Sequence, residues 1–262
     1  LYFFASNWKG MTHLEKVAVV ISTMLIPYLL AFTIKSLSLS YKNLCLFAGA
    51  FIFGIGVALI GQTYNSHADS YLLFLVWSIP TILLSLVIRY EPFYVLSIIL
   101  VNLTGWLYIN TYFTHMEWPS FIKMFLLNLA LTSIFCLSEH FTNTGRHSKY
   151  IAFVCASFYL YLLTFYGIVK WYYLITNPLF IACILGTGVY HLRKKLDVPM
   201  VYICAAISAF YIISKYFEIM IYNFADDVFI LMILFGFGLI ALNHYAFEKI
   251  NLEIKKVRHD KQ

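Results

Sequence analysis

The chain has 262 residues, of which 62% are hydrophobic and only 11% are charged. Soluble domains carry about 25% charged residues, so this composition excludes a soluble globular protein and favours a bundle of membrane helices. The net charge of +6 does not indicate nucleic-acid binding, because most basic residues lie in short loops and a C-terminal tail.

The chain opens with a short apolar stretch, residues 1–5, followed by Asn7 and Trp8. Five residues are too few for the apolar region of a signal peptide, which needs roughly 7–15. The stretch is typical of the last turn of a helix. We therefore expect that further residues precede Leu1.

Nine apolar stretches follow, each long enough for a spanning helix, which needs about 20 residues and at least ~17. They cover residues 16–34, 44–61, 71–88, 93–110, 121–137, 151–169, 171–190, 200–221 and 228–247. The pattern predicts an all-α, polytopic bundle of about nine helices in a lipid bilayer over residues 1–247. Residues 248–262 form a basic tail.

Basic residues are divided unequally between the two sets of loops. The loops after the second, fourth and sixth stretches, together with the chain start, hold Lys9, Lys16, Lys123 and Lys170. Cytoplasmic loops carry the excess of Lys and Arg, so the richer set and the C-terminus are predicted to be cytoplasmic. The richer set comprises the loops after the first, third, fifth and seventh stretches and the C-terminal tail. It holds Lys35, Lys42, Arg89, Arg146, Lys149, Arg193, Lys194, Lys195, Lys249, Lys255, Lys256, Arg258 and Lys261.

We expect the small side chains inside the apolar stretches to serve helix packing. The cysteines share no spacing typical of disulfides or zinc: Cys45, Cys136, Cys155, Cys183 and Cys204. Small residues four apart let helix backbones approach closely. Such pairs are Ala50 with Gly54, Ala182 with Gly186, and Ala205 with Ala209.

The most polar short connection is the predicted outer loop at residues 61–70. It contains Gln62, Tyr64, Asn65 and Asp69 and has no basic residue. One interpretation is a hydrogen-bonding site for a polar ligand at the outer mouth of the bundle. The other is a helix cap and turn that ties neighbouring helices together.

The same loop carries a family resemblance. The run Gly61-Gln62-Thr63-Tyr64-Asn65, then Ala68-Asp69-Ser70-Tyr71, Leu73-Phe74 and Trp77, resembles a pattern in the family called domain of unknown function 2157. Phe3-Phe4-Ala5-Ser6-Asn7-Trp8 is similar to the aromatic-Asn-Trp element of that family. The resemblance covers roughly the first third of the chain. It implies a multi-helix protein of the bacterial inner membrane, and it assigns no reaction or substrate.

Three His-x-acid triplets lie in three different predicted outer loops. Imidazole and carboxylate groups are ligands for zinc or manganese, so converging loops would form a metal site. The alternative is that these are solvated loop residues, because the i, i+2 spacing is not a metal signature. The triplets are His13 with Glu15, His67 with Asp69, and His115 with Glu117.

Lys215 and Glu218 are ionisable residues inside the eighth stretch. Three residues apart, they share a helix face and can pair. A charge within a membrane segment is costly and often functional, so the pair indicates proton or ion coupling. The alternative is a self-neutralised anchor near the outer end of the helix.

The sequence favours a transport or small-ligand-binding role, with Gln62, Tyr64, Asn65, Asp69, Lys215 and Glu218 as the outward-facing site. The alternative is a non-catalytic subunit or scaffold that assembles with other membrane proteins or with copies of itself. A metal-dependent membrane enzyme is the third hypothesis. No phosphate-binding loop, HExxH or GxSxG motif is present, so a non-enzymatic role is favoured and no cofactor is identified.

Overall fold

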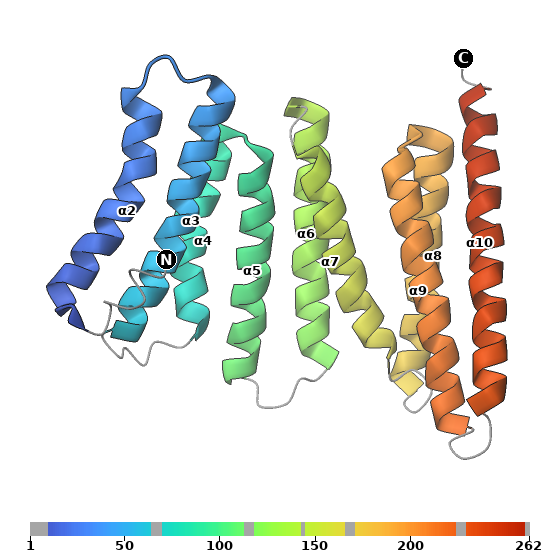
Figure 1. Ribbon diagram of the computed structural model, residues 1–262. Helices are drawn as coiled ribbons and strands as arrows, with labels where there is room; N and C mark the ends of the chain where they lie inside the picture. The colour runs from blue at the N-terminus through green and yellow to red at the C-terminus, as the bar shows by residue number, and fades with distance from the viewer. Residues whose placement is uncertain are drawn as a thin grey trace. The chain divides into compact units, whose positions relative to one another are not determined.

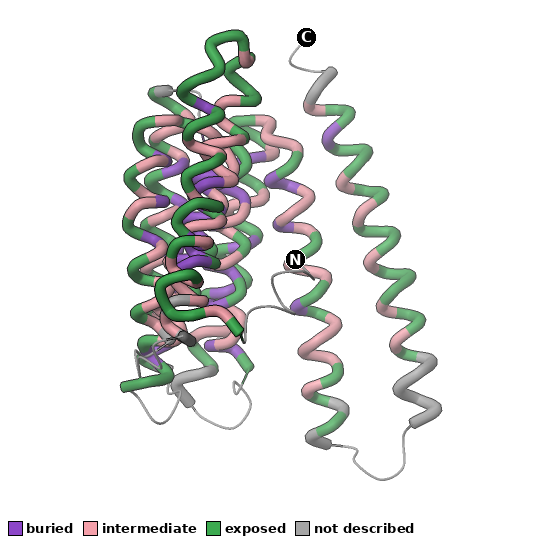
Figure 2. Tube along the Cα trace, turned by 60° about the vertical axis from the view of Figure 1, so that its left-hand side comes forward, coloured by how far each residue is buried: buried purple, intermediate pink, exposed green. Residues whose placement is uncertain are grey.

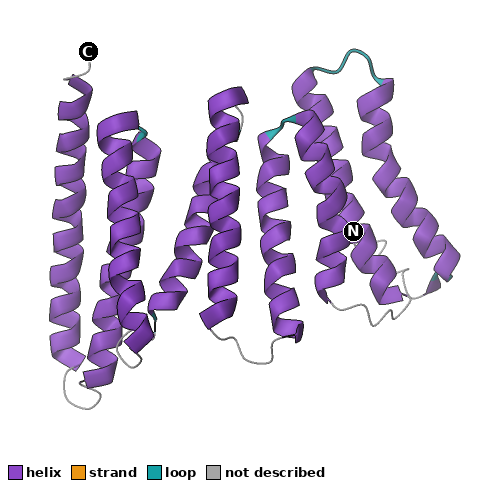
Figure 3. Cartoon of the chain, turned by 180° about the vertical axis from the view of Figure 1, so that it is seen from behind, coloured by secondary structure: helices purple, strands orange, loops and turns teal. Residues whose placement is uncertain are grey.

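A computed structural model gives the fold of residues 10–63, 70–112, 118–142, 145–165, 171–223 and 229–259. Over these ranges the chain is helical and contains no strand, as Figure 3 shows. The all-α fold that the hydropathy pattern predicts is therefore confirmed for the part of the chain that the structure describes.

The helices follow one another through short connections, and Figure 1 labels them. A π-helical turn, η2 (His191–Lys195), continues α8, and Leu196 ends it in the left-handed conformation with φ of 52°. The helix bounds are α2 (His13–Thr33), α3 (Leu39–Thr63), α4 (Ser70–Ile88), α5 (Glu91–Tyr112), α6 (Trp118–Thr142), α7 (Arg146–Thr164), α8 (Trp171–Tyr190), α9 (Val198–Asn223) and α10 (Phe229–His259).

Seven helices in the described ranges are long and apolar enough to cross a membrane. They are α2 to α6, α8 with η2, and α9. Large apolar side chains are exposed on them; Leu83 and Val87 of α4, for example, are 59% and 81% exposed. Figure 2 shows exposed positions recurring along the helices. Lipid tails are as apolar as leucine, so a bilayer is the medium in which this exposure is stable.

Several helices extend beyond the apolar stretches that predict them. Helix α3 begins at Leu39 rather than at residue 44, α6 continues to Thr142, and α7 begins at Arg146. Hydropathy detects the apolar centre of a helix, whereas backbone hydrogen bonds continue into its polar ends. Helix α7 ends at Thr164, five residues before the predicted end at residue 169, and residues 166–170 lie outside the described ranges.

Residues 1–116 and 131–151 form the first of two compact units. Within this unit α2 packs on α3, α3 on α4, and α4 on α5. The Trp77 indole of α4 donates a hydrogen bond to the Ala50 carbonyl of α3 at 3.0 Å. A Cβ atom at Gly54 would lie only 2.0 Å from the Trp77 ring. Gly54 therefore leaves space in which the Trp77 ring packs on α3, whereas the predicted close approach of two backbones at Ala50 and Gly54 stays a prediction.

Residues 117–130 and 152–262 form the second unit. Here α8 packs on α9, and α10 packs on α9 and η2. A Cβ atom at Gly188 would lie 3.3 Å from the Cβ of Cys204, so α8 and α9 approach closely at this point. At Gly186 such an atom would meet no described neighbour within 4 Å. Among the described residues no helix makes the close approach predicted at Ala182 and Gly186, because this face of α8 is exposed.

Candidate functional site

Lys215 and Glu218 of α9 form an ion pair within a candidate membrane span. The Lys215 Nζ lies 2.6 Å from the Glu218 Oε2, as the three-residue spacing predicts. Each side chain is only 14% exposed. The mutual neutralisation of the two charges is what allows both to sit in a helix that is otherwise apolar.

The same lysine also contacts the end of α7. Its Nζ donates a hydrogen bond to the carbonyl oxygen of Thr164, the last residue of that helix. The Thr176 hydroxyl of α8 donates to the neighbouring Leu163 carbonyl at 2.9 Å. The last carbonyls of a helix have no partner within the helix and carry partial negative charge, so a cation and a hydroxyl stabilise them. These two contacts join α7, α8 and α9.

Tyr211 and Asn177 extend the polar cluster. Tyr211 lies one helical turn before Lys215, and its ring centroid is 5.9 Å from the Lys215 Nζ. Its hydroxyl donates to the Asn177 Oδ1 of α8 at 2.7 Å. Pro178 follows Asn177 and has no N–H to donate to the Leu174 carbonyl, four residues earlier in α8. Polar groups therefore gather where α8 and α9 face each other.

An open cavity of about 640 Å³ on the surface of the second unit adjoins this cluster, and its wall residue Leu174 is 61% exposed. Lys215, Tyr211 and Asn177 supply a cation, a hydroxyl and an amide to its wall. The remaining wall is formed by Leu174, Ile212, Tyr216 and Ile219. A mostly apolar cavity with a few convergent polar groups is the usual form of a small-molecule site.

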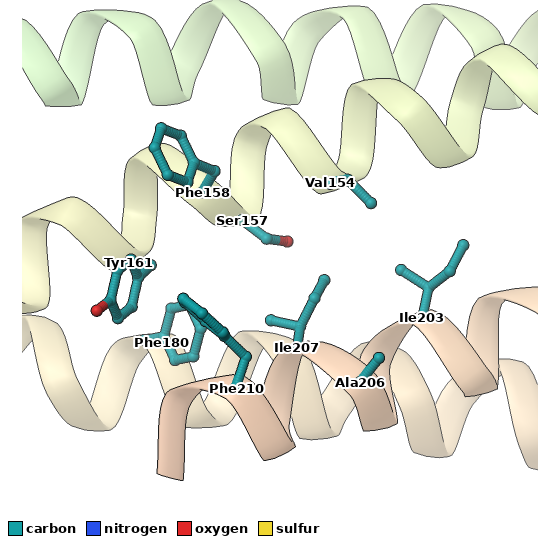
Figure 4. Close-up of a pocket in the computed structure, with 9 residues that line it drawn as sticks. All are labelled: Val154, Ser157, Phe158, Tyr161, Phe180, Ile203, Ala206, Ile207 and Phe210. Carbon is teal, nitrogen blue, oxygen red and sulfur yellow. The ribbon is translucent and has the colours of Figure 1, made fainter. Parts of the chain in front are cut away.

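A second cavity, of about 340 Å³, is almost wholly apolar. Figure 4 shows Val154, Ser157 and Tyr161 of α7 on one side and Ile203, Ile207 and Phe210 of α9 on the other. Phe180 of α8 lines this cavity and stacks on Tyr211 with 4.6 Å between ring centroids. The stacked pair therefore joins the wall of the apolar cavity to the wall of the polar one.

A further ion pair lies in the first unit and involves Lys149, one of the predicted loop cations. The Lys149 Nζ lies 2.7 Å from the Glu139 Oε2, and the Lys149 side chain is only 2% exposed. The neighbouring Ser148 hydroxyl donates to the Glu91 Oε2 at 2.7 Å. These contacts hold the first turn of α7 against α6 and α5. The ten-residue separation of Glu139 and Lys149 follows no helical periodicity, so no pattern in the sequence predicts this pair.

The remaining residues of the predicted polar site lie at or beyond the limit of what the structure describes. Gln62 lies in the last turn of α3, and the position of its side chain is not among the described features. Tyr64, Asn65 and Asp69 lie outside the described residues. Their convergence on a ligand stays a prediction.

The metal site that the His-x-acid triplets predict is described only at its first triplet. His13 and Glu15 lie in the first turn of α2, where the Glu15 carboxylate accepts a hydrogen bond from the Thr12 N–H at 2.7 Å. This contact and the Thr12 hydroxyl form a capping box, which explains Glu15 without a metal. His67, Asp69, His115 and Glu117 lie outside the described residues. Within the described ranges no group of three or more potential ligands is close enough to hold an ion.

The described residues of the family-like run have packing roles. The Tyr71 hydroxyl lies 2.9 Å from the Tyr112 hydroxyl, which joins α4 to α5. Phe74 stacks near Trp77, with 6.3 Å between ring centroids, and Trp77 bonds to α3. These aromatic residues therefore hold α3, α4 and α5 together.

Asn177, Tyr211, Thr164 and Thr176 are residues of the cluster that the sequence analysis did not select. Tyr211, Lys215 and Glu218 are spaced four and three apart, so they lie on one face of α9. This spacing is a signal that predicts Tyr211 as a neighbour of the ion pair. The other three residues come from α7 and α8, and their approach depends on tertiary packing that the sequence does not reveal.

The comparisons with known proteins concern the first third of the chain. Residues 1–94 match the model of a family described as "Predicted membrane protein (DUF2157)". The comparison with the curated proteins found no match, and neither did the comparison with the solved structures. The Lys215–Glu218 cluster lies outside the matched residues. The chain is thus a membrane protein with several apolar helices, and its first 94 residues are similar to the DUF2157 family.

Proposed function

We propose that this protein of the bacterial inner membrane binds a small polar solute at the Lys215–Glu218 cluster and takes part in its transport. The observation that carries the proposal is an ion pair within a candidate membrane span, beside an open cavity of about 640 Å³. Ionisable residues in such segments are rare and mark solute and ion pathways. The positive-inside pattern predicts that this end of α9 faces the outer side.

A small zwitterion is the class of solute that the cluster fits best. The Lys215 ammonium can bind a carboxylate, and the Glu218 carboxylate can bind an ammonium group. Asn177 and Tyr211 supply hydrogen bonds that fix orientation. A zwitterion that separates the pair replaces each lost contact and adds no net charge. This neutrality matters because a lone charge at the centre of a membrane costs at least ~2.5 kcal/mol.

The outer-loop residues belong to the same proposal as a second set of polar groups. Gln62 lies in the last turn of α3, and Tyr64, Asn65 and Asp69 follow it in the sequence. Their amide, hydroxyl and carboxylate groups suit a polar solute on the outer side. Substitution of Gln62 and Asn65 by alanine tests this part separately from the Lys215–Glu218 cluster.

The proposal is tested by measuring the melting temperature of the protein in lipid nanodiscs while amino acids, carboxylates and amines are added. A bound solute raises the melting temperature because it stabilises only the folded state. We expect at least one amino acid to do so, and the K215M/E218L variant to lose the effect. The control variant K256M/E253L removes an exposed lysine and an exposed glutamate of the same spacing. It should retain the rise in melting temperature when the solute is added. An unchanged response in K215M/E218L would contradict the proposal.

A non-catalytic subunit or scaffold is the second candidate function. The bond from Lys215 to the Thr164 carbonyl supports it, because the cation also ties α9 to the end of α7. In this case no small solute changes the melting temperature of the wild-type protein. Gentle extraction then yields the chain together with other subunits at fixed stoichiometry.

A further inference from the structure

A third cavity, of about 310 Å³, lies among α8, α9 and α10 of the second unit. The cavity exists because several residues of its wall have small side chains, and larger side chains at these positions would fill it. Gly188 of α8, Ala205 and Ala209 of α9, and Ala246 of α10 belong to this wall. The rest of the wall is mainly aliphatic, with Ile184, Val189 and Ile250 among its residues. The cavity is therefore suited to a hydrocarbon chain.

Basic residues follow the wall of this cavity directly in the sequence. Leu192 of η2 lines the cavity, and Arg193, Lys194 and Lys195, the next residues in the same turn, are exposed. The turn is held by hydrogen bonds from the N–H groups of Leu196 and Asp197 to the His191 carbonyl. The backbone therefore fixes where these long basic side chains begin.

Helix α10 supplies the facing wall of the cavity. Phe247 and Ile250 line the cavity, whereas the exposed Lys249 between them places its Nζ 5.6 Å from the ring centroid of Tyr245, which does not line the cavity. The Tyr202 hydroxyl of α9 donates to the Asn251 Oδ1 of α10, so this part of α10 is tied to α9. The exposed basic residues next to the cavity wall in the sequence therefore belong to η2, which contacts α10.

We propose that this place binds an anionic glycerophospholipid. One acyl chain enters the apolar cavity, and the phosphate lies against Arg193 and Lys195. Arginine and lysine bind phosphate oxygens through charge-assisted hydrogen bonds. The predicted orientation places η2 on the cytoplasmic side, where anionic lipids attract basic groups near helix ends. Neither the cavity nor the cations alone would select this class of lipid.

Native mass spectrometry of delipidated protein in detergent tests the proposal, with phosphatidylglycerol, phosphatidylcholine and glycerol phosphate as separate probes. We expect one tightly bound phosphatidylglycerol and weaker binding of phosphatidylcholine. Glycerol phosphate, which carries the headgroup chemistry without acyl chains, should bind too weakly to be retained. Each cation near an anionic surface contributes enough that R193Q/K195Q should weaken phosphatidylglycerol binding about thirtyfold.

Matched variants distinguish lipid binding at this site from a general effect of positive charge and from a loss of protein stability. K35Q/K42Q removes two cations from another predicted cytoplasmic loop and should leave the affinity within about twofold. A246L fills the cavity and should reduce phosphatidylglycerol binding, whereas A18L, at an exposed position of α2, should not.

Three results would each overturn the proposal. The first is equal binding of phosphatidylglycerol and phosphatidylcholine, and the second is an equal loss in R193Q/K195Q and K35Q/K42Q. The third is undiminished binding to A246L in protein whose melting temperature matches that of the wild type. The site shares no residue with the Lys215–Glu218 pair, so its failure would leave the proposed function standing.

Discussion

Lys215 is the residue on which most of the candidate site depends. Its ammonium group contacts the Glu218 carboxylate and the Thr164 carbonyl, and it lies near the ring of Tyr211. Each of these groups carries negative charge or partial negative charge. Removal of the lysine therefore affects a helix end and a buried carboxylate at the same time.

The first prediction concerns this ion pair. K215M leaves the Glu218 carboxylate, which is 14% exposed, without its cation and should lower the free energy of unfolding by roughly 3–5 kcal/mol. K215M/E218L removes both charges, so it should be closer to the wild type than K215M is. Unfolding in mixed detergent micelles measures both values. A double variant that is less stable than K215M would contradict this account of the pair.

The second prediction concerns Gly54. G54A places a Cβ atom 2.0 Å from the Trp77 ring and should cost about 1–3 kcal/mol, because α3 and α4 must separate or the indole must move. G186A is the control, since its Cβ meets no described atom within 4 Å. It should be neutral or stabilise the protein by up to about 1 kcal/mol, because alanine favours helix more than glycine does. Equal effects of the two substitutions would show that contact with Trp77 is not the cause.

Helix α7 shows where an element ends for reasons outside its own sequence. Apolar residues continue past Thr164, so hydropathy predicts a helix to residue 169. In the structure the carbonyls of Leu163 and Thr164 accept hydrogen bonds from Thr176 and Lys215 instead. Side chains of α8 and α9 thus stabilise the end of α7, and no pattern in the sequence of α7 predicts that end.

The third prediction tests this helix end. T176V keeps the shape of the side chain but removes the hydroxyl that bonds to the Leu163 carbonyl of α7, and should cost about 1 kcal/mol. T104V removes a hydroxyl that bonds within its own helix, to the Leu100 carbonyl, and should cost under about 0.5 kcal/mol. The measurement compares the free energies of unfolding of T176V, T104V and the wild-type protein. If T104V costs as much as T176V, the contact between helices has no special role.

Periodicity and hydropathy predict much of this protein and leave a definable part out. They predict the all-α fold and the membrane environment, because these depend on local composition. They also place Lys215 and Glu218 on one face. They miss Asn177 and the ion pair of Lys149 and Glu139, because these contacts join residues on separate helices.

The fourth prediction concerns the orientation of the whole chain in the membrane. The excess of lysine and arginine in alternate loops predicts that η2 and the C-terminal tail face the cytoplasm. Alkaline phosphatase fused after residue 195 or at the C-terminus should be inactive, and green fluorescent protein at the same positions should fluoresce. Active phosphatase at either position would contradict the predicted topology.

The claim that the Lys215–Glu218 cluster holds a small solute is tested most directly by native mass spectrometry of gently extracted protein. We expect the wild-type chain to carry an extra mass in the range of a small zwitterion, and K215M/E218L to lack it while retaining bound lipid. An extra mass that is identical in both proteins, or a wild-type chain that carries none after incubation with amino acids, would contradict the claim.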